Sequence, residues 1–272
     1  MGKFDGVLLA ADYDDTLYDT KGTISPENRE AIERFIAEGG LFTVSTGRSY
    51  VNFAIQMELE KVPVNVPVIL SNGSSIYDFS KKTFLWHKDL PQETAAHLAQ
   101  VCAEFPEVGF EAYHGDEIYT FRANAATEKH LKRCHLTGLP RTIEEMPGPW
   151  LKVILQHMDS SYLEEIRQYI LDYWPDLYEA TFSNPYLLEL TAKGANKGLA
   201  VKRLADSLGI AADHIYCVGN GLNDIPMLEV AAMAFAPDNC YDEVKEWGAH
   251  ILPSCDEHCV ARLIEHLEKR YA

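Results

Sequence analysis

The chain has 272 residues, which corresponds to about two domains of ordinary size or to one domain with a large insertion. Hydrophobic residues make up 47% and charged residues 24%, a balance that excludes an intrinsically disordered or collagen-like chain. The net charge of −17 argues against nucleic acid and anionic membranes as partners, because both would be repelled at long range.

The cysteine pattern and the lack of long apolar runs favour a cytoplasmic protein. The six cysteines form no CxxC pair, and we expect them to be reduced thiols. A zinc site formed by Cys255, Cys259 and His258 is the less favoured alternative, because the usual pairs of closely spaced ligands are missing. No apolar run reaches the roughly 18 residues that cross a bilayer, so we expect no membrane span.

The first third of the chain alternates apolar runs with one clear amphipathic helix. Ser25 and Pro26 form a typical helix start, and Gly39 with Gly40 ends the same helix. The apolar runs around this helix are predicted strands, namely Val7–Ala11, Leu41–Ser45 and Val66–Ser71. This alternation is typical of βα units around a mostly parallel sheet.

The middle of the chain has a different pattern, with more strands and separate helices. The predicted helices are Gln92–Glu104, Asn124–His135 and Ser160–Tyr173. The predicted strands are Glu117–Arg122, Leu151–Gln156, Tyr178–Ser183 and Tyr186–Thr191. These elements indicate a second unit of the α+β class.

The last part of the chain returns to βα alternation. Its predicted helices and strands are Asn196–Gly209, Ile215–Val218, Ala232–Ala236, His250–Leu252 and Asp256–Lys269. We therefore predict an α/β fold with a Rossmann-like, doubly wound parallel-sheet core. Residues 1–82 and 189–272 would form this core, and residues 83–188 would form an inserted α+β domain.

Polar residues follow four of the predicted core strands, at the point where each strand ends. In an open parallel sheet, the ligand crevice lies beyond the carboxyl ends of the strands, so we expect these residues to converge. They are Asp12–Leu17, Thr46–Arg48, Asn72–Gly73 and Gly219–Asp224, together with Lys197 at the start of a predicted helix.

The pair Asp12 and Asp14 is the strongest candidate for chemistry. On an extended segment the two carboxylates point to the same side, where they repel unless a cation lies between them or one keeps its proton. Mg²⁺ takes oxygen ligands, and Asn220 offers a further one. The alternative is a solvated acidic turn or a helix cap. A Ca²⁺ loop is excluded, because Thr16 and Leu17 stand where that loop needs Asp or Asn and then Gly.

Taken one at a time, the other residues also have ordinary interpretations. Thr46 and Gly47 could form a simple turn, and a lysine at a helix start, such as Lys197, is usually solvated. Asn223 and Asp224 could cap a helix. Only their joint placement at strand ends favours a site for a phosphoryl group.

Four ordered motifs resemble those of the haloacid dehalogenase superfamily and, within it, the Cof-type sugar-phosphate phosphatases with a type IIB cap. The motifs are Asp12–Leu17, Thr46–Arg48, Lys197–Gly198 and Gly219–Leu228. Residues Val68–Gly73 and the insertion are also similar to this subgroup, so the resemblance covers essentially the whole chain. Two positions depart from the family pattern: Asp15 replaces a Gly, and Asn220 replaces an Asp that is a metal ligand in the family.

The resemblance implies Mg²⁺-dependent hydrolysis of small phosphomonoesters through an aspartyl-phosphate. Asp12 would attack phosphorus, and Asp14 would protonate the leaving alcohol and then deprotonate water. The implied phosphate-binding residues are Thr46, Gly47, Lys197 and Asn223, and the implied rim residues are Arg48, Asn72 and Gly73. The implied Mg²⁺ ligands are Asp12, Asp14, Asn220 and Asp224, the last either as a ligand or as the group that orients Lys197 or a metal-bound water.

Two other functions stay open at this point. One is phosphotransfer between sugar positions, as in phosphomutases that share the first motif. The other is a sensor that binds a small phosphorylated metabolite without turnover, which only Asn220 suggests. Tyr113, His114 and Tyr119 are candidate substrate-facing residues of the inserted domain.

Overall fold

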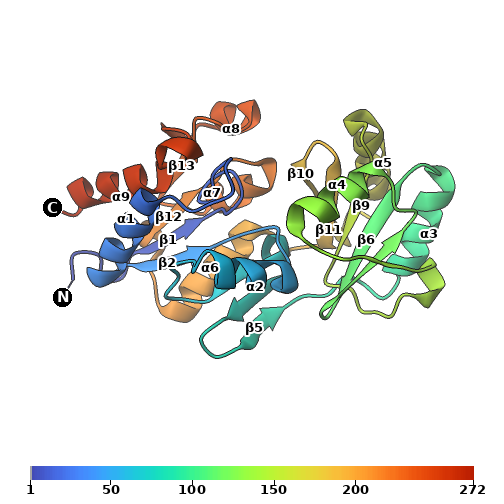
Figure 1. Cartoon of the computed structure of the whole chain (residues 1–272), viewed down its shortest axis with the longest axis horizontal. Helices are drawn as coiled ribbons and strands as arrows, with labels where there is room; N and C mark the ends of the chain where they lie inside the picture. The colour runs from blue at the N-terminus through green and yellow to red at the C-terminus, as the bar shows by residue number, and fades with distance from the viewer. Residues whose placement is uncertain (1) are drawn as a thin grey trace. The chain divides into compact units, whose positions relative to one another are not determined.

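The computed structural model describes residues 2–272 and confirms the predicted α/β fold (Figure 1). The chain divides into two compact units. The first unit contains the residues up to Gly47, Phe53–Trp86 and Asn196–Ala272, and the second contains Arg48–Asn52 and His87–Ala195. The first unit is therefore built from separate stretches of the chain.

A parallel sheet forms the centre of the first unit, with the strand order β14-β13-β12-β1-β2. Its strands are β1 (Leu8–Ala11), β2 (Leu41–Val44), β12 (Ile215–Val218), β13 (Met233–Pro237) and β14 (His250–Leu252). All four residues of β1 are fully buried, because helices cover both faces of the sheet. This double burial explains why the central strands read as continuous apolar runs.

A small three-stranded sheet, in which β3 and β4 are antiparallel, follows β2 in the chain. Its strands are β3 (Val68–Leu70), β4 (Ser75–Asp78) and β5 (Thr83–His87). The Thr46 amide donates to the carbonyl of Ile69 at 2.9 Å, and Ser45 forms a parallel bridge with the same residue. The end of β3 therefore lies beside the end of β2.

Within residues 2–272, six helices lie outside the stretch His87–Ala195. They are α1 (Pro26–Ala37), α2 (Tyr50–Leu59), α6 (Lys197–Leu208), α7 (Ile225–Glu229), α8 (Asp242–Trp247) and α9 (Cys259–Arg270). Helices α1 and α9 lie side by side (Figure 1). Helix α6 packs on β3, β4 and α7. The cluster that includes Leu8, Ala10, Val201 and Leu204 joins the sheet to α6. Short 3₁₀ turns follow β3 and β12, at Ser71–Gly73 and Leu222–Asp224.

The second unit has a six-stranded sheet with the order β10-β11-β9-β6-β7-β8. Neighbouring strands are antiparallel except for β7 and β8. The strands are β6 (Gly109–His114), β7 (Glu117–Phe121), β8 (Leu139–Pro140), β9 (Lys152–Gln156), β10 (Tyr178–Asn184) and β11 (Leu187–Ala192). The helices are α3 (Thr94–Glu104), α4 (Ala125–Cys134) and α5 (Ser160–Tyr173).

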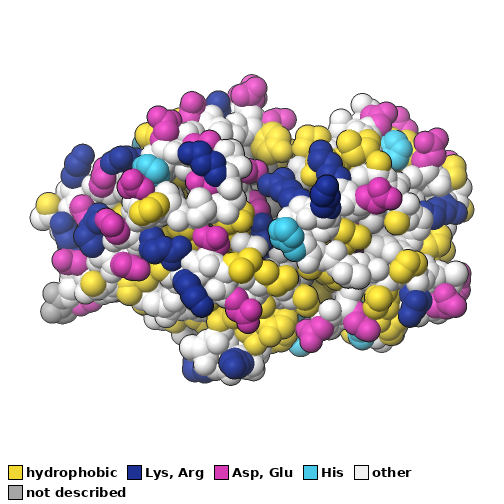
Figure 2. Space-filling model, viewed as in Figure 1, with side chains coloured by type: hydrophobic (Ala, Val, Ile, Leu, Met, Phe, Trp, Pro, Cys, Tyr) yellow, Lys and Arg dark blue, Asp and Glu magenta, His cyan; other side chains and the backbone are white. Residues whose placement is uncertain are grey.

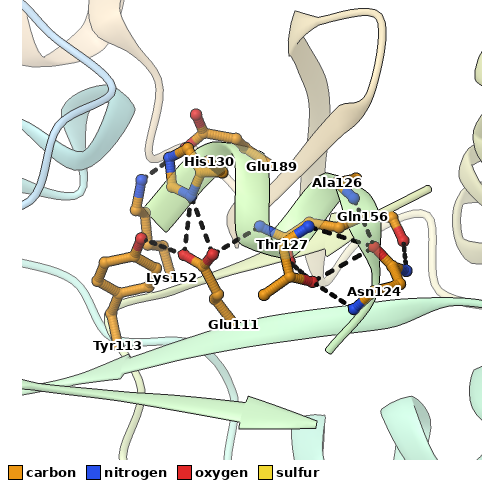
Figure 3. A network of polar contacts seen from close by, with 9 residues as sticks. All are labelled: Glu111, Tyr113, Asn124, Ala126, Thr127, His130, Lys152, Gln156 and Glu189. Atoms are coloured by element: carbon orange, nitrogen blue, oxygen red, sulfur yellow. Dashed lines mark hydrogen bonds and ion pairs between the residues drawn. The ribbon is translucent and has the colours of Figure 1, made fainter. Parts of the chain in front are cut away.

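The two faces of this second sheet differ in polarity. Val153 and Leu155 of β9 join the large apolar cluster that also contains residues of α3 and α5. Lys152, Ile154 and Gln156 alternate with them and point to the opposite face, as the period of a strand requires. On that face lies a buried polar network (Figure 3).

The polar network is centred on the carboxylate of Glu111, which is fully buried. It accepts hydrogen bonds from Tyr113 Oη at 2.6 Å and from Gln156 Nε2 at 2.7 Å, and it pairs with His130 Nδ1 at 2.9 Å (Figure 3). Because His130 lies on α4, the network ties this helix to the sheet. A second buried pair, Lys152 with Glu189 at 2.9 Å, lies on the same face.

The surface carries charges of both signs. Figure 2 shows Asp and Glu side chains spread among Lys and Arg over the visible face. Helix α4 carries two exposed cations, Lys132 and Arg133, in its last turn. Within residues 2–272, no helix is long and apolar enough to cross a membrane.

Candidate active site

The centre of the site is a buried lysine held by two carboxylates. Lys197 Nζ lies 2.6 Å from Asp12 Oδ1 and 2.5 Å from Asp224 Oδ1. The three residues come from the end of β1, the first turn of α6 and the turn after β12. The structure thus brings together residues that are more than 180 positions apart in the chain.

Local sequence explains how Lys197 reaches this position. Asn196 caps α6 by accepting a hydrogen bond from the amide of Leu199 at 2.9 Å, so that the lysine begins the helix. The next residue is Gly198, where a Cβ atom would lie 2.0 Å from the carbonyl oxygen of Pro226. Only glycine allows α6 to approach α7 this closely, and this approach places Lys197 beside Asp224.

Burial and charge perturb the acid–base properties of the group. Burial, followed by the charge of Asp224, raises the pKa of Asp12 to about 8, although Lys197 acts in the opposite direction. Burial alone would lower the pKa of Lys197, but the two carboxylates hold it above its ordinary value. Lys197 is therefore a permanent cation. A carboxyl with so high a pKa needs additional positive charge to ionise fully at neutral pH.

Asp224 has both carboxylate oxygens occupied. Its Oδ1 contacts Lys197, and its Oδ2 accepts hydrogen bonds from the backbone amides of Asn220 and Gly221 at 2.9 and 2.8 Å. The residue is fully buried. This arrangement fits a residue that orients the lysine and shapes the 219–224 turn, rather than one with an oxygen left over for a metal.

A second group of oxygen atoms faces the side chain of Asn220. Asp12 Oδ2 and the carbonyl oxygen of Asp14 lie 3.1 and 3.2 Å from one end of its amide. A carboxylate, a backbone carbonyl and an amide are the ligands that a hard cation such as Mg²⁺ takes. The donor set thus fits Mg²⁺ in kind. Across residues 2–272, no three side chains from His, Cys, Asp or Glu cluster as a metal site.

The turn after β3 has an unusual backbone. Ser71, Asn72 and Gly73 all have positive φ angles, 51°, 53° and 89°. At Gly73 a Cβ atom would lie 2.2 Å from the carbonyl oxygen of Asn196, so a side chain there would push against the start of α6. Consecutive left-handed residues are strained, and such strain is concentrated at functional sites.

This turn presents an unsatisfied donor. Asn72 is held by its backbone amide, which donates to Thr46 O at 3.0 Å, and by its Oδ1, which accepts from Asn223 Nδ2 at 3.0 Å. Its Nδ2 is buried and has no hydrogen-bond partner. A buried amide without a partner is costly unless a ligand accepts its hydrogen bond.

The second motif contributes buried residues from the end of β2. Thr46 is 1% exposed and follows the strand directly. Arg48 is also buried, and its Nη1 donates to Asn52 Oδ1 at 2.9 Å. Arg48 groups with the second unit by its contacts, whereas Thr46 and Gly47 group with the first.

The comparison with known proteins identifies the family. A model of the haloacid dehalogenase-like hydrolases matches residues 9–264, almost the whole chain. The chain belongs to this family. The 5-amino-6-(5-phospho-D-ribitylamino)uracil phosphatase YwtE of Bacillus subtilis is 27% identical over 95% of this chain and 97% of its own. Phosphatase YwpJ of the same organism is 26% identical, over 96% and 99%.

Solved structures agree on the fold of this hydrolase. A haloacid dehalogenase-like hydrolase from Bacteroides thetaiotaomicron matches with a TM-score of 0.82 at 23% identity, over 96% of this chain and 99% of its own. The subclass IIB sugar phosphatase BT4131 matches with a TM-score of 0.85 at 22% identity, over the same shares. The prediction of a phosphatase of this family is confirmed.

Two supporting residues of this phosphatase were not among the predicted site residues. Asn239 Nδ2 donates to the carbonyl oxygen of Asp15, and its Oδ1 accepts from the amide of Cys255. Asp15 has a φ of 57°, which explains why the family pattern has glycine there. Thr16 is fully buried and lies 3.1 Å from the Asn220 amide. No local signal marks Asn239, whereas Thr16 lies within the first motif, Asp12–Leu17.

The three candidate residues of the inserted domain have partners inside the second unit. Tyr113 Oη donates to Glu111, and Tyr119 Oη donates to Glu117. His114 Nδ1 lies 2.7 Å from the carbonyl oxygen of Pro149. Their role toward a substrate stays a prediction.

Proposed function

We propose that this phosphatase hydrolyses small phosphomonoesters, such as sugar phosphates, through an aspartyl-phosphate on Asp12. The observation that carries the proposal is the position of Lys197, fully buried and bound to both Asp12 and Asp224. A permanent cation beside the carboxylate lowers the repulsion between two anions, the nucleophile and the phosphoryl group. Covalent capture on Asp12 would divide one difficult displacement into two easier ones.

The remaining residues have roles that follow from their positions. Asp14 is partly exposed, two residues after the nucleophile, so it can donate a proton to the leaving alcohol and later accept one from water. Thr46, Gly47 and Asn223 would bind phosphoryl oxygens at the ends of β2 and β12. Asn72 Nδ2 would donate to the substrate, which satisfies a buried donor that otherwise lacks a partner.

Arg48 and Gly73 would complete the rim. The second unit would act as the cap that selects the substrate.

Mg²⁺ is the proposed cofactor, held by Asp12, Asp14 and Asn220. When bound, it would supply positive charge against the phosphate and the nucleophile. The buried Asp12 carboxyl, whose pKa is raised to about 8, gains from such charge because burial opposes its ionisation. Six free cysteines fit a cytoplasmic location.

The test is phosphate release from a panel of sugar phosphates with Mg²⁺. The panel includes 5-amino-6-(5-phospho-D-ribitylamino)uracil, the compound in the name of the relative YwtE. Wild type should release phosphate, Asp12→Asn should not, and phosphorus from substrate should be recovered on Asp12 of acid-quenched wild type. Transfer to a second sugar would instead indicate a phosphomutase.

A phospho-ligand sensor is the second candidate, because the neutral Asn220 replaces a charged ligand of the family pattern. Ligand binding by wild type without phosphate release from any member of the panel would favour it.

A further inference from the structure

We infer that Asn239 is a positioning residue of this phosphatase, because it holds Asp15 in a left-handed conformation and so fixes the backbone that carries Asp12 and Asp14. The inference rests on the proposed function, since it concerns the same two carboxylates. It goes further in giving a consequence for catalysis to a side chain whose hydrogen bonds go to backbone groups.

The segment after the nucleophile folds back on itself within a few residues. The carbonyl of Asp12 accepts a hydrogen bond from the amide of Leu17 at 3.4 Å, and the carbonyl of Tyr13 accepts one from the amide of Tyr18 at 2.8 Å. Asp14 also forms a bridge with Tyr18. The positions of both carboxylates of the proposed mechanism therefore depend on the shape of one tight turn.

Asp15 is the residue at which this turn reverses its direction. Its φ is 57°, in the left-handed region that crowds the Cβ atom of any residue other than glycine. The reversal brings the amides of residues 16–18 back to the carbonyls of Asp12 and Tyr13. Relaxation of Asp15 to a negative φ would draw these amides away. The left-handed state therefore needs support from outside the turn.

Asn239 supplies this support from the loop between β13 and α8. Its Nδ2 donates to the carbonyl oxygen of Asp15 at 2.9 Å, and its Oδ1 accepts from the amide of Cys255 at 2.8 Å. The side chain thus links the reversal point of the turn to the 3₁₀ turn that precedes α9. Without Asn239, the steric preference of Asp15 acts against a carbonyl that has lost this donor.

Two neighbouring contacts keep the turn attached to the same C-terminal segment. The buried Cys259 Sγ donates to the carbonyl oxygen of Thr16 at 3.2 Å. The Asp256 carboxylate accepts from the amide of Thr20 at 3.0 Å and from its hydroxyl at 2.7 Å. Because both contacts remain when Asn239 is replaced, we expect a local change of the turn and not its detachment. Asn239→Ala should lower kcat by roughly three- to tenfold, the effect of one ordinary hydrogen bond, and change KM less than about twofold.

Glycine at position 15 separates this role from a merely structural one. Glycine adopts a φ of 57° without the steric penalty of a Cβ atom, so the turn should keep its shape without Asn239. In the Asp15→Gly background, Asn239→Ala should therefore lower kcat by less than about twofold. The Asp15 side chain is absent from both proteins of this second pair, so its own contacts do not affect the comparison.

The experiment measures kcat and KM for phosphate release from one substrate of the sugar-phosphate panel, with the four proteins of this double-mutant cycle. Asn239→Asp is a second variant, because it keeps an acceptor for the Cys255 amide and loses the donor to Asp15. It should lower kcat at least as much as Asn239→Ala does.

The matched control is Asn65→Ala. Asn65 is exposed, as Asn239 is, and it also bridges two backbone groups: it accepts from the amide of Phe42 at 2.8 Å and donates to the carbonyl of Gly40 at 3.0 Å. These groups lie at the amino end of β2, the opposite end from Thr46. Asn65→Ala should lower Tm and leave kcat unchanged.

The second readout is the conformation of Asp15 itself, which needs neither substrate nor metal. The nuclear Overhauser effect between the amide and Hα protons of one residue is strong at a positive φ, because the two protons lie close together, and weaker at a negative φ. Asp15 should give a strong signal in wild type and a weaker one in Asn239→Ala.

The inference expects a loss of kcat that disappears in the Asp15→Gly background, together with the weaker Asp15 signal. An equal loss in both backgrounds, a loss of the same size in Asn65→Ala, or wild-type kcat in Asn239→Ala would overturn it. A weak Asp15 signal in wild type, or the same signal in Asn239→Ala, would also overturn it. Absence of phosphate release from the whole panel would contradict the proposed function, and the Asp15 signal would still decide whether Asn239 holds the turn.

Discussion

The substitution Asp12→Asn should remove turnover and at the same time stabilise the metal-free protein. The Asp12 carboxyl is 6% exposed, and its pKa is raised to about 8. For an acid whose folded pKa lies above its unfolded value of 3.8, stability is greatest below the unfolded pKa and falls as pH rises through the folded pKa. At pH 7 the raised pKa of Asp12 therefore lowers the free energy of unfolding by up to about 4 kcal/mol, at 1.36 kcal/mol per pKa unit.

Asparagine carries no such cost and can still accept a hydrogen bond from Lys197. The cost already includes the attraction between Asp12 and Lys197. The NH₂ group of asparagine has to be accommodated in a buried site, which offsets part of the gain and leaves roughly 1–3 kcal/mol. For a chain of this size that corresponds to roughly 3–10 °C in Tm. The gain should depend on pH in the same direction. The Tm of the variant should equal that of wild type near pH 4 and exceed it most at pH 8.

The assay is thermal unfolding in EDTA at pH 4, 6 and 8, together with phosphate release in Mg²⁺ at pH 7. The matched control is Asp14→Asn, which should slow turnover by roughly 10²- to 10⁴-fold and change Tm little, because Asp14 is partly exposed. A lower Tm for Asp12→Asn at pH 8, or phosphate release near the wild-type rate, would refute the reasoning.

Three further substitutions test the packing around the two polar clusters. Lys197→Met should lower the free energy of unfolding by about 3–5 kcal/mol and abolish activity, because it leaves two buried carboxylates without their cation. Urea unfolding measures the change, and a loss below about 1 kcal/mol would contradict the buried pairing. Gly198→Ala should lower kcat by roughly 100-fold, since its Cβ meets Pro226 and displaces the lysine; unchanged kcat would show that α6 has room to move. In the second unit, burial alone would lower the pKa of His130, but hydrogen bonds and the charge of Glu111 raise it to about 10. The His130→Asn variant should therefore lose the full stabilisation by the charged His130 below about pH 6.5, and this loss should disappear as pH rises through about 10. Urea unfolding of wild type and variant at pH 6 and 10 measures it. The same difference in unfolding free energy at both pH values would refute the charged state of His130.

The elements that the sequence predicted well have strong local signals. Helix α1 begins at Pro26 after the Ser25 cap and ends before Gly39, as expected, and β12 and β14 match their predicted bounds. Helix α9 begins later than predicted, because Cys255–Glu257 forms a 3₁₀ turn and His258 has a φ of 67°. Here the backbone conformation, which composition does not encode, decides the boundary.

Two missed elements show where local reasoning stops. Helix α2 has apolar residues spread around its whole circumference, so no period marks it, and the hydrogen bond from the Asn52 amide to Ser49 Oγ at 3.5 Å leaves the cap as its one local signal. Strand β6 contains Glu111, which is fully buried. A charged residue in a central strand is tolerable only because His130, Tyr113 and Gln156 surround it, and two of these come from other elements.

The site was predictable to the extent that strand ends converge. Asp12 and Asp224 meet because the carboxyl ends of parallel strands share one edge of the sheet, and Lys197 reaches them from the start of α6. The contact between Thr16 and the Asn220 side chain and the bridge that Asn239 makes to Asp15 were not predictable. Both depend on hydrogen bonds between residues that no spacing rule connects.

The pairing of β1 with β12 has a consequence for the order in which this protein acquires its structure during synthesis. Leu8 pairs with Ile215, roughly 200 residues later, whereas the strands of the second unit all lie between Gly109 and Ala192. The second unit is therefore completely synthesised before β1 has a partner on that side. Until then β1 exposes an unpaired, fully apolar edge, which is the kind of segment that aggregates or recruits chaperones. Lys197 likewise leaves the ribosome before Asp224 and β12, so the first unit cannot complete its core until both have been synthesised.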